Sequence, residues 1–260
     1  MAKSYYEART PRWQRITIWI IAIAMAGGTL LGFVFMALAA RNPELASSGI
    51  TAKKTEEAQA ELEKKETERQ KKIDAQNAEL TKKYLAELNS YQSQVQAFEP
   101  TGLGDVKTED LKIGDGAEIT DDNTNYSMYY IGWKPTGEIF DSSIDGETLK
   151  SPLPGSGSYI TGWNEGVIGM KIGGVRLITI PADKAYGADG SGCDEDGENC
   201  VIPPDTPLKF IVMAIATPDD IPYPKGTLAV CEKAFASYAT QYGIPAVELC
   251  QLYGYDNEEK

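Results

Sequence analysis

The sequence predicts an α+β domain, in which an antiparallel sheet wraps one short helix, preceded by a transmembrane helix and a long helical stalk. Three observations support this prediction: an uncharged apolar run over residues 16–40, a stretch without Gly or Pro over 52–98, and short runs of alternating apolar residues over 106–217. These patterns are typical of a membrane span, a long helix and a set of β-strands, respectively.

The apolar run over residues 16–40 is long enough to cross a membrane, because a helix of this length extends about 37 Å and a hydrocarbon core is about 30 Å thick. Arg41 is the only nearby basic residue after the run, whereas four precede it: Lys3, Arg9, Arg12 and Arg15. The positive-inside rule therefore predicts a single-pass protein of the cell membrane, with residues 1–15 in the cytoplasm and the chain after Arg41 outside it. The alternative is a signal peptide cleaved at Ala37-Leu38-Ala39, but the run exceeds the usual signal-peptide core of about 7–15 residues.

Residues 41–99 are expected to form the helical stalk, because Ala, Glu, Lys, Gln and Leu dominate the stretch over 52–98. Residues 52–79 lack an apolar stripe, which predicts a solvated helix. Further along, apolar side chains recur at alternating steps of four and three: Tyr84, Leu88, Tyr91, Val95 and Phe98. This seam indicates either a short coiled coil, with self-association through residues 80–98, or docking on a folded domain. Pro100 is expected to end the helix.

Residues 106–218 are expected to form the sheet domain, since apolar residues alternate there in short runs between turn residues. One short helix is expected over 164–170, and a Pro-Thr-Gly turn at 135–137 separates the first two strands. The expected strands are 127–133, 138–141, 175–180 and 208–215.

Residues 219–260 are expected to form a helical hairpin of two short helices, 228–241 and 246–253. It is too small to bury a core by itself, so it is expected to cap the sheet domain or to bind a partner. The four cysteines form two local pairs, which predicts two disulfides in an oxidising compartment rather than four free thiols in the cytosol: Cys193 with Cys200, and Cys231 with Cys250.

The composition excludes several classes of function. Lys and Arg total 25 against 38 Asp and Glu, giving a net charge of −13, which argues against nucleic acid as a partner. The chain contains no histidine. Ser-His-Asp and Cys-His catalysis and histidine-ligated zinc are therefore excluded.

Strand patterns do not explain why Trp163, Tyr186 and Asp141 are each bracketed by Gly or by an FDSS turn. Several separated motifs occur in one order: YIG at 130–132, GEIFDSS at 137–143, ITGW at 160–163, AYG at 185–187, IPP at 202–204 and LKF at 208–210. This ordered set, covering a little over a third of the chain, resembles the FKBP-type peptidyl-prolyl cis-trans isomerases.

The resemblance implies an apolar prolyl pocket that needs no cofactor and no metal. Trp163 would be the floor under the proline ring, Tyr186 and the N–H of Ile160 would bond a substrate carbonyl, and Asp141 would orient polar groups. The implied catalytic set is Tyr130, Phe140, Asp141, Ile160, Trp163, Tyr186, Ile202 and Phe210, with Val201, Tyr159 and Leu153 as further substrate contacts.

Two parts of this region depart from the family pattern. Lys150 stands where a pocket phenylalanine is usual, and Leu149 or Leu153 is expected to fill the gap. The loop over 189–200 is long and acidic, and a disulfide would close it beside the pocket. Its carboxylates do not have EF-hand spacing, so a solvated acidic loop is favoured over a calcium site. Macrolide affinity and substrate preference are therefore open.

The predicted function is prolyl isomerisation of exported polypeptides during their folding, by an enzyme held at the membrane through residues 16–40. Its expected partners are proline-containing segments, with an apolar residue before the proline as the family implies. Two alternatives remain open: an FKBP-fold module that binds such segments without turnover, and a structural envelope protein that acts through its stalk and its C-terminal hairpin.

Overall fold

The computed structural model describes residues 46–102, 104–194 and 199–259. They form two compact units: the sheet unit is Ile73–Asp220, and the hairpin unit joins the chain up to Lys72 to the segment from Ile221 onward. The predicted cytoplasmic segment 1–15 and transmembrane helix 16–40 lie outside the described residues. Within the described ranges, no helix combines the length and the apolar character that a membrane span requires.

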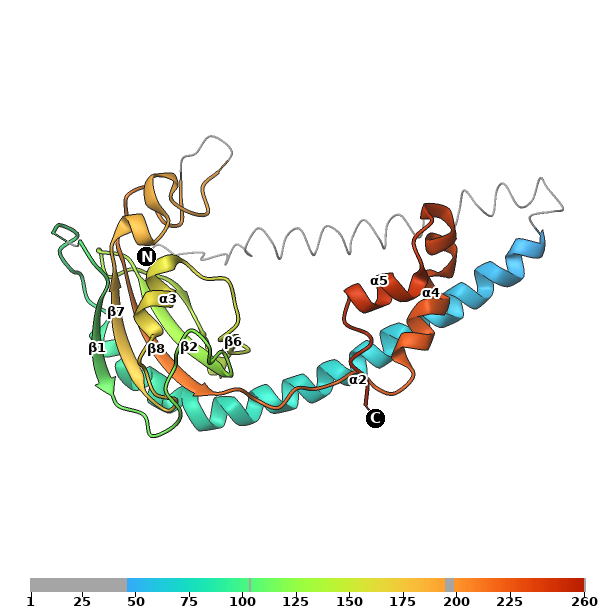
Figure 1. Ribbon diagram of the computed structural model, residues 1–260, viewed down its shortest axis with the longest axis horizontal. Helices are drawn as coiled ribbons and strands as arrows, with labels where there is room; N and C mark the ends of the chain where they lie inside the picture. The colour runs from blue at the N-terminus through green and yellow to red at the C-terminus, as the bar shows by residue number, and fades with distance from the viewer. Residues whose placement is uncertain (1–45, 103, 195–198, 260) are drawn as a thin grey trace, which may run out of the picture. The chain divides into compact units, whose positions relative to one another are not determined.

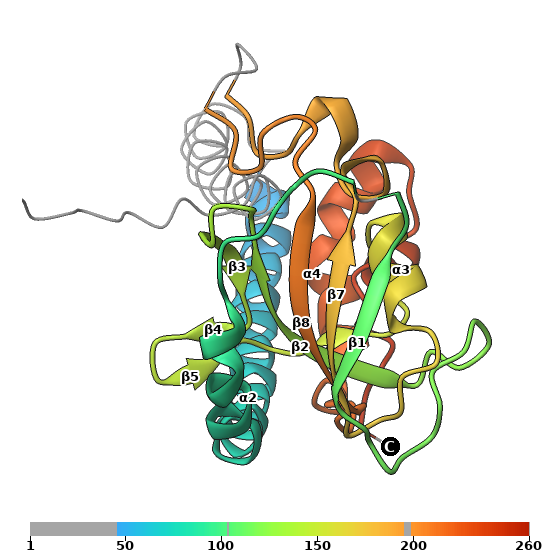
Figure 2. The same ribbon diagram turned by 90° about the vertical axis from the view of Figure 1, so that its left-hand side faces the viewer.

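The sheet unit is an α+β fold with an antiparallel sheet, as the sequence predicts. The sheet has the order β1-β7-β8-β2-β3, with β6 paired to β2 as well, and every pairing is antiparallel (Figure 2). Two further short strands, β4 (Ile144–Asp145) and β5 (Thr148–Leu149), pair with each other. The strands of the main sheet are β1 (Lys107–Lys112), β2 (Tyr126–Trp133), β3 (Ile139–Ser142), β6 (Leu153–Pro154), β7 (Val175–Ile180) and β8 (Leu208–Ala216).

The central strands β2, β7 and β8 confirm the sequence prediction to within one residue at each end. Strand β1 was not predicted, because it is an edge strand with almost every side chain exposed and carries the charges that protect edges from aggregation. The short helix α3 spans Thr161–Val167 and so begins and ends three residues before the predicted 164–170. Gly162 lies inside it because a Cβ there would meet the Ile180 side chain at 2.2 Å, so the glycine allows close packing on β7.

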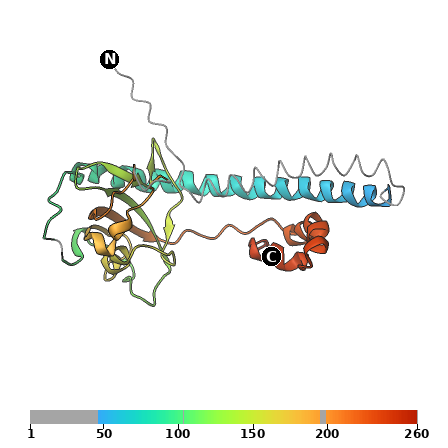
Figure 3. The same ribbon diagram turned by 90° about the horizontal axis from the view of Figure 1, so that it is seen from above.

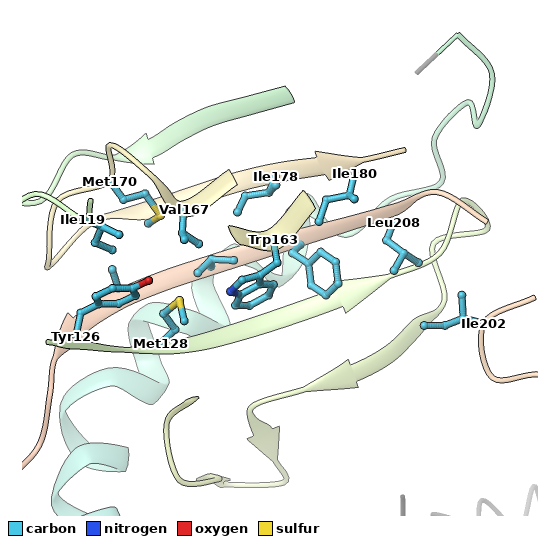
Figure 4. Close-up of a cluster of buried hydrophobic side chains, with 13 residues drawn as sticks. Ile119, Tyr126, Met128, Trp163, Val167, Met170, Ile178, Ile180, Ile202 and Leu208 are labelled. Carbon is cyan, nitrogen blue, oxygen red and sulfur yellow. The ribbon is translucent and has the colours of Figure 1, made fainter. Parts of the chain in front are cut away.

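Alternating side chains give the sheet two buried faces. The front face is the one covered by α3, and its core lies around Trp163 (Figure 4). The buried residues of this front face are Ile119, Tyr126, Met128, Trp163, Val167, Met170, Ile178, Ile180, Ile202, Leu208, Phe210, Val212 and Ala214.

The back face of the sheet is covered by the docking segment, residues 80–98. This segment comprises the last part of helix α2 (Ala46–Ser90), the 3-10 turn η2 (Tyr91–Gln94) and the extended residues that follow. Leu88 is fully buried there beside Tyr129 and Trp133. The structure thus confirms docking on a folded domain. A coiled coil through the same side chains would require them to leave their contacts with the sheet.

Helix α2 ends at Ser90 and not at Pro100 as the sequence predicts. The reason is two hydrogen bonds, one to the end of β2 and one to the β2–β3 turn, which require an extended chain after the 3-10 turn. The Phe98 N–H donates to the Pro135 carbonyl at 2.9 Å, and Trp133 Nε1 donates to the Gln96 carbonyl at 3.0 Å.

The hairpin unit contains the helices α4 (Thr227–Tyr242) and α5 (Ala246–Leu252), close to their predicted bounds (Figure 1). The buried Cys231–Cys250 disulfide joins them, as predicted. Gly243, with φ of 67°, ends α4 in the left-handed conformation that glycine adopts without strain.

Helix α2 is one continuous helix (Figure 3). The prediction that residues 52–79 form a solvated helix needs correction, because part of this stretch packs on the C-terminal helices. Ala58 and Leu62 are buried against α4 and α5. Two buried residues are too few to form an apolar stripe that can be seen in the sequence. The other contacts that hold this part of α2 are polar. These are the Tyr255 hydroxyl to Glu66, Arg69 to the Ile221 carbonyl, Lys65 to the Lys225 carbonyl and Lys72 to Glu259.

Candidate functional site

An aromatic cluster forms the centre of the candidate site on the front face. Trp163, in the first turn of α3, is 3% exposed. Its ring centroid lies 5.5 Å from that of Tyr130, 5.6 Å from Tyr159 and 5.1 Å from Phe210. The Tyr130 and Phe210 rings stand nearly perpendicular to the indole, at 89° and 85°, which is a favourable arrangement for aromatic pairs. Phe140 adds a further edge-to-face contact with Phe210.

Gly132 on β2 leaves the room that this cluster needs. A Cβ at this position would lie 2.6 Å from Phe210 and 2.8 Å from Phe140. The glycine of the YIG motif therefore sets the packing of the two phenylalanines, which the sequence alone does not indicate.

A polar rim lies along one side of the cluster and consists of Tyr130, Asp141 and Lys150. Asp141 accepts hydrogen bonds from the Tyr130 hydroxyl, from the Ser142 N–H at 2.8 Å and from Lys150 Nζ at 3.1 Å. Ser143, which is buried, accepts the Tyr130 N–H at 2.9 Å and so fixes the backbone of the tyrosine. The rim thus holds one carboxylate in a set orientation beside the aromatic floor.

Burial and the neighbouring carboxylate keep the site tyrosines protonated. Burial raises the pKa of Tyr130 most, and its bond to Asp141 raises it further. Burial raises the pKa of Tyr159 to about 12, and burial followed by the charge of Asp141 raises that of Tyr186. These hydroxyls therefore remain hydrogen-bond donors at neutral pH, a role that suits positioning and not proton transfer.

The structure places most of the predicted site residues together. Ile160 is the N-cap of α3, and its N–H makes no hydrogen bond to any part of the chain that the structure describes. Tyr186 is 37% exposed. The residues that form or pack against the front-face core are Tyr130, Phe140, Leu153, Tyr159, Ile160, Trp163, Ile202 and Phe210.

Leu149 and Leu153, the two residues expected to fill the gap at Lys150, lie in different cores. Leu153 packs against the front-face core, whereas Leu149 is buried in the core of the back face and does not fill the gap. Val201 is 50% exposed and lies outside the packed cluster, although its carbonyl accepts a bond from Lys134 Nζ at 3.2 Å. Of the three expected substrate contacts, Leu153 and Tyr159 thus border the aromatic cluster most closely.

Arg176 is a positioning residue that the sequence reasoning missed. Its guanidinium is buried, bonds Asp110 through two nitrogens at 2.6 and 3.1 Å, and donates to the carbonyls of Gly166 and Ile168 at the end of α3. It therefore anchors the helix that carries Trp163. The sequence does contain a signal for this role: Arg176 is a lone charged residue inside the apolar strand β7. A buried charge needs partners, so such a residue is expected to bond to neighbouring elements.

The Cys193–Cys200 disulfide closes the acidic loop, as predicted. Asp196 and Glu198 of this loop lie outside the described residues, so the expectation of a solvated loop without calcium stays a prediction. Among the residues that are described, no group of three Asp, Glu or Cys side chains is arranged to hold a metal ion.

Comparisons with known proteins point to one family. The family model described as FKBP-type peptidyl-prolyl cis-trans isomerase matches residues 116–215, which contain every predicted residue of the pocket. An FK506-binding protein of Neisseria meningitidis serogroup B is 40% identical over 110 residues, covering 42% of this chain and 94% of the relative. A probable FK506-binding protein of Corynebacterium glutamicum is 43% identical over 99 residues, covering 37% of this chain and 80% of the relative. The crystal structure of AtFKBP13 is 32% identical, with a TM-score of 0.38, and covers 44% of this chain and 93% of its own.

Proposed function

Because this chain belongs to the FKBP-type peptidyl-prolyl cis-trans isomerase family, we propose that it is a membrane-anchored enzyme that acts on exported polypeptides as they fold. Its isomerase activity follows from the family. The observation that supports the compartment best is the presence of two disulfides, because such bonds persist in oxidising environments and are rare in the cytosol. The apolar run over 16–40, with basic residues mainly on its N-terminal side, supports the anchor and its orientation.

The chemistry requires no bond to break. The barrier of about 20 kcal/mol to rotation comes from the double-bond character of the Xaa-Pro amide, which a polar solvent stabilises in the planar form. In our proposal the proline ring rests on Trp163, and the surrounding rings remove water from the amide. Tyr186 and the Ile160 N–H bond the flanking carbonyls of the substrate. The twisted amide is thereby bound more tightly than either planar form, which lowers the barrier.

Asp141 orients the rim through its bond to the Tyr130 hydroxyl, so Asp141→Asn is expected to lower kcat/KM about ten-fold, equivalent to about 1.4 kcal/mol of transition-state stabilisation. The measurement is catalysed isomerisation of an Ala-Leu-Pro-Phe peptide by the full chain in mild detergent. Asp145→Asn, an exposed acid outside the cluster, is the matched control and is expected to leave kcat/KM unchanged. Equal rates for both variants would contradict the role of Asp141, and a folded wild type without any acceleration would favour a binding module.

The proposed compartment predicts that all four cysteines are oxidised in the cell. Cells are quenched with acid and the protein is labelled with a maleimide-linked polymer, before and after reduction. We expect no labelled cysteine before reduction and four after it. A chain lacking residues 1–40, which should stay in the cytoplasm, is the control and is expected to be labelled without reduction. Labelling of the full chain without reduction would contradict export.

A further inference from the structure

A lysine ammonium lies at the mouth of the aromatic site. Lys150 Nζ is 3.1 Å from Asp141 Oδ1, and the two side chains are 51% and 47% exposed. Asp141 in turn accepts the hydroxyl of Tyr130, whose ring packs against Trp163. The positive charge is thus separated from the aromatic floor by only one carboxylate and one tyrosine ring, and it remains accessible to solvent.

The chain around Lys150 is held on both sides. Its own N–H donates to the Ser143 carbonyl at 2.8 Å. The preceding residue, Leu149, is 4% exposed in the back-face core, and its N–H donates to Thr81 Oγ1 on α2 at 3.0 Å. The docking segment therefore helps to fix the backbone position from which Lys150 extends toward Asp141.

After the hydrogen bonds within the rim are made, N–H donors of Lys150 remain available, whereas most acceptor positions of Asp141 are occupied. A carboxylate has about four acceptor positions, and three of those on Asp141 are taken by Tyr130, Ser142 and Lys150. An ammonium group has about three N–H donors, and within the described residues one of those on Lys150 is used. The Lys150–Asp141 pair carries no net charge, but the unused hydrogen-bonding groups of the rim are mainly the N–H donors of Lys150, which fit an acceptor that carries negative charge.

We propose that Lys150 is a specificity residue that favours an acidic over a basic residue next to the proline of the substrate. The inference rests on the isomerase function of the same pocket and names the charge preference of that pocket. Successive residues of an extended peptide are about 3.5 Å apart, so the side chain flanking a proline seated on Trp163 can reach the rim. A flanking Asp or Glu carboxylate would take the free donors of Lys150, whereas a flanking lysine would be repelled.

The test compares kcat/KM for five peptides on the full chain: Ala-Leu-Pro-Phe, the same peptide with Glu or Lys before the proline, and the same peptide with Glu or Lys after it. For at least one of the two positions we expect the wild type to prefer Glu over Lys about five-fold, the upper range for a partly exposed ion pair. Lys150→Met is expected to abolish this preference and Lys150→Arg to retain it. Lys107→Met, on the exposed edge strand β1 at the other side of the sheet, is the matched control and is expected to keep it.

The possible failures are distinguishable. Equal rates for Glu and Lys peptides at both positions, with the Leu peptide accelerated, would overturn the role of Lys150 and leave the isomerase intact. A preference for Glu that persists in Lys150→Met would also overturn it, because another group would then be responsible. No acceleration of any peptide, by a chain that circular dichroism shows to be folded, would overturn the proposed function itself.

Discussion

Replacing Leu88 by Ala is expected to lower the free energy of unfolding of the sheet unit by about 3 kcal/mol, the middle of the range for a buried Leu-to-Ala change. Leu88 is fully buried between α2 and the sheet, in contact with the core that contains Tyr129, Ile131 and Trp133. Truncation removes this apolar contact and leaves a cavity between the end of α2 and the sheet. The measurement is urea unfolding followed by tryptophan fluorescence, since Trp133 and Trp163 both lie in this unit.

The matched control is the same chemical change at an exposed position. Leu252 on α5 is 81% exposed, so Leu252→Ala is expected to change stability by less than about 0.5 kcal/mol. If Leu88→Ala cost less than about 1 kcal/mol, the docking segment would not be part of the core that the sheet requires.

Trp163→Leu is expected to lower kcat/KM for the Ala-Leu-Pro-Phe peptide at least about ten-fold while the domain stays folded. The change removes the floor of the site and its ring contacts with Tyr130, Tyr159 and Phe210. Leucine is smaller and has no planar face, so the proline ring loses its support and water enters beside the amide. Binding of the twisted amide weakens more than that of the flexible remainder of the peptide.

Trp133→Leu provides the matched comparison, because Trp133 is equally buried but belongs to the back face. Here we expect a loss of stability of about 2 kcal/mol, from lost packing and from the bond between Nε1 and the Gln96 carbonyl. At a temperature where the variant is folded, kcat/KM should stay within about two-fold of wild type, because the site lies across the sheet. The opposite result, with activity lost in Trp133→Leu and kept in Trp163→Leu, would place the site on the back face and contradict this prediction.

The central strands were predictable because apolar residues alternate there in short runs bounded by turn residues. Strand β1 was not, since an exposed edge strand needs no apolar pattern. The docking segment was not assigned to the sheet domain: the predicted domain begins at residue 106, whereas the compact unit that contains the sheet begins at Ile73. The apolar seam over residues 84–98 did indicate an apolar partner, but a periodic stripe does not reveal whether that partner is another helix or a sheet.

The candidate site was predictable to the extent that its residues are aromatic and occur in a recognisable order. Trp163, Tyr130 and Phe210 meet as expected, because strands β2 and β8 pair with each other and α3 packs on the same face of the sheet. The contact between Lys150 and Asp141 depends on the path of the β4–β5 turn, which is set by Leu149 entering the back-face core. No local pattern encodes that path, so the sequence indicated a missing phenylalanine but not the ion pair in its place.

The pairing of β8 has a consequence for the order in which the sheet unit can fold. Strand β8 is the last strand in the chain, yet it lies in the sheet between β2 and β7 and pairs with both. The docking segment is synthesised well before the strands it covers, so its apolar side chains have no partner until the whole sheet has been made. Such long-range pairing is slow and leaves apolar surface exposed during synthesis. This isomerase therefore passes through an interval of its own in which apolar surface is exposed, the stage of folding at which we propose that it acts on other chains.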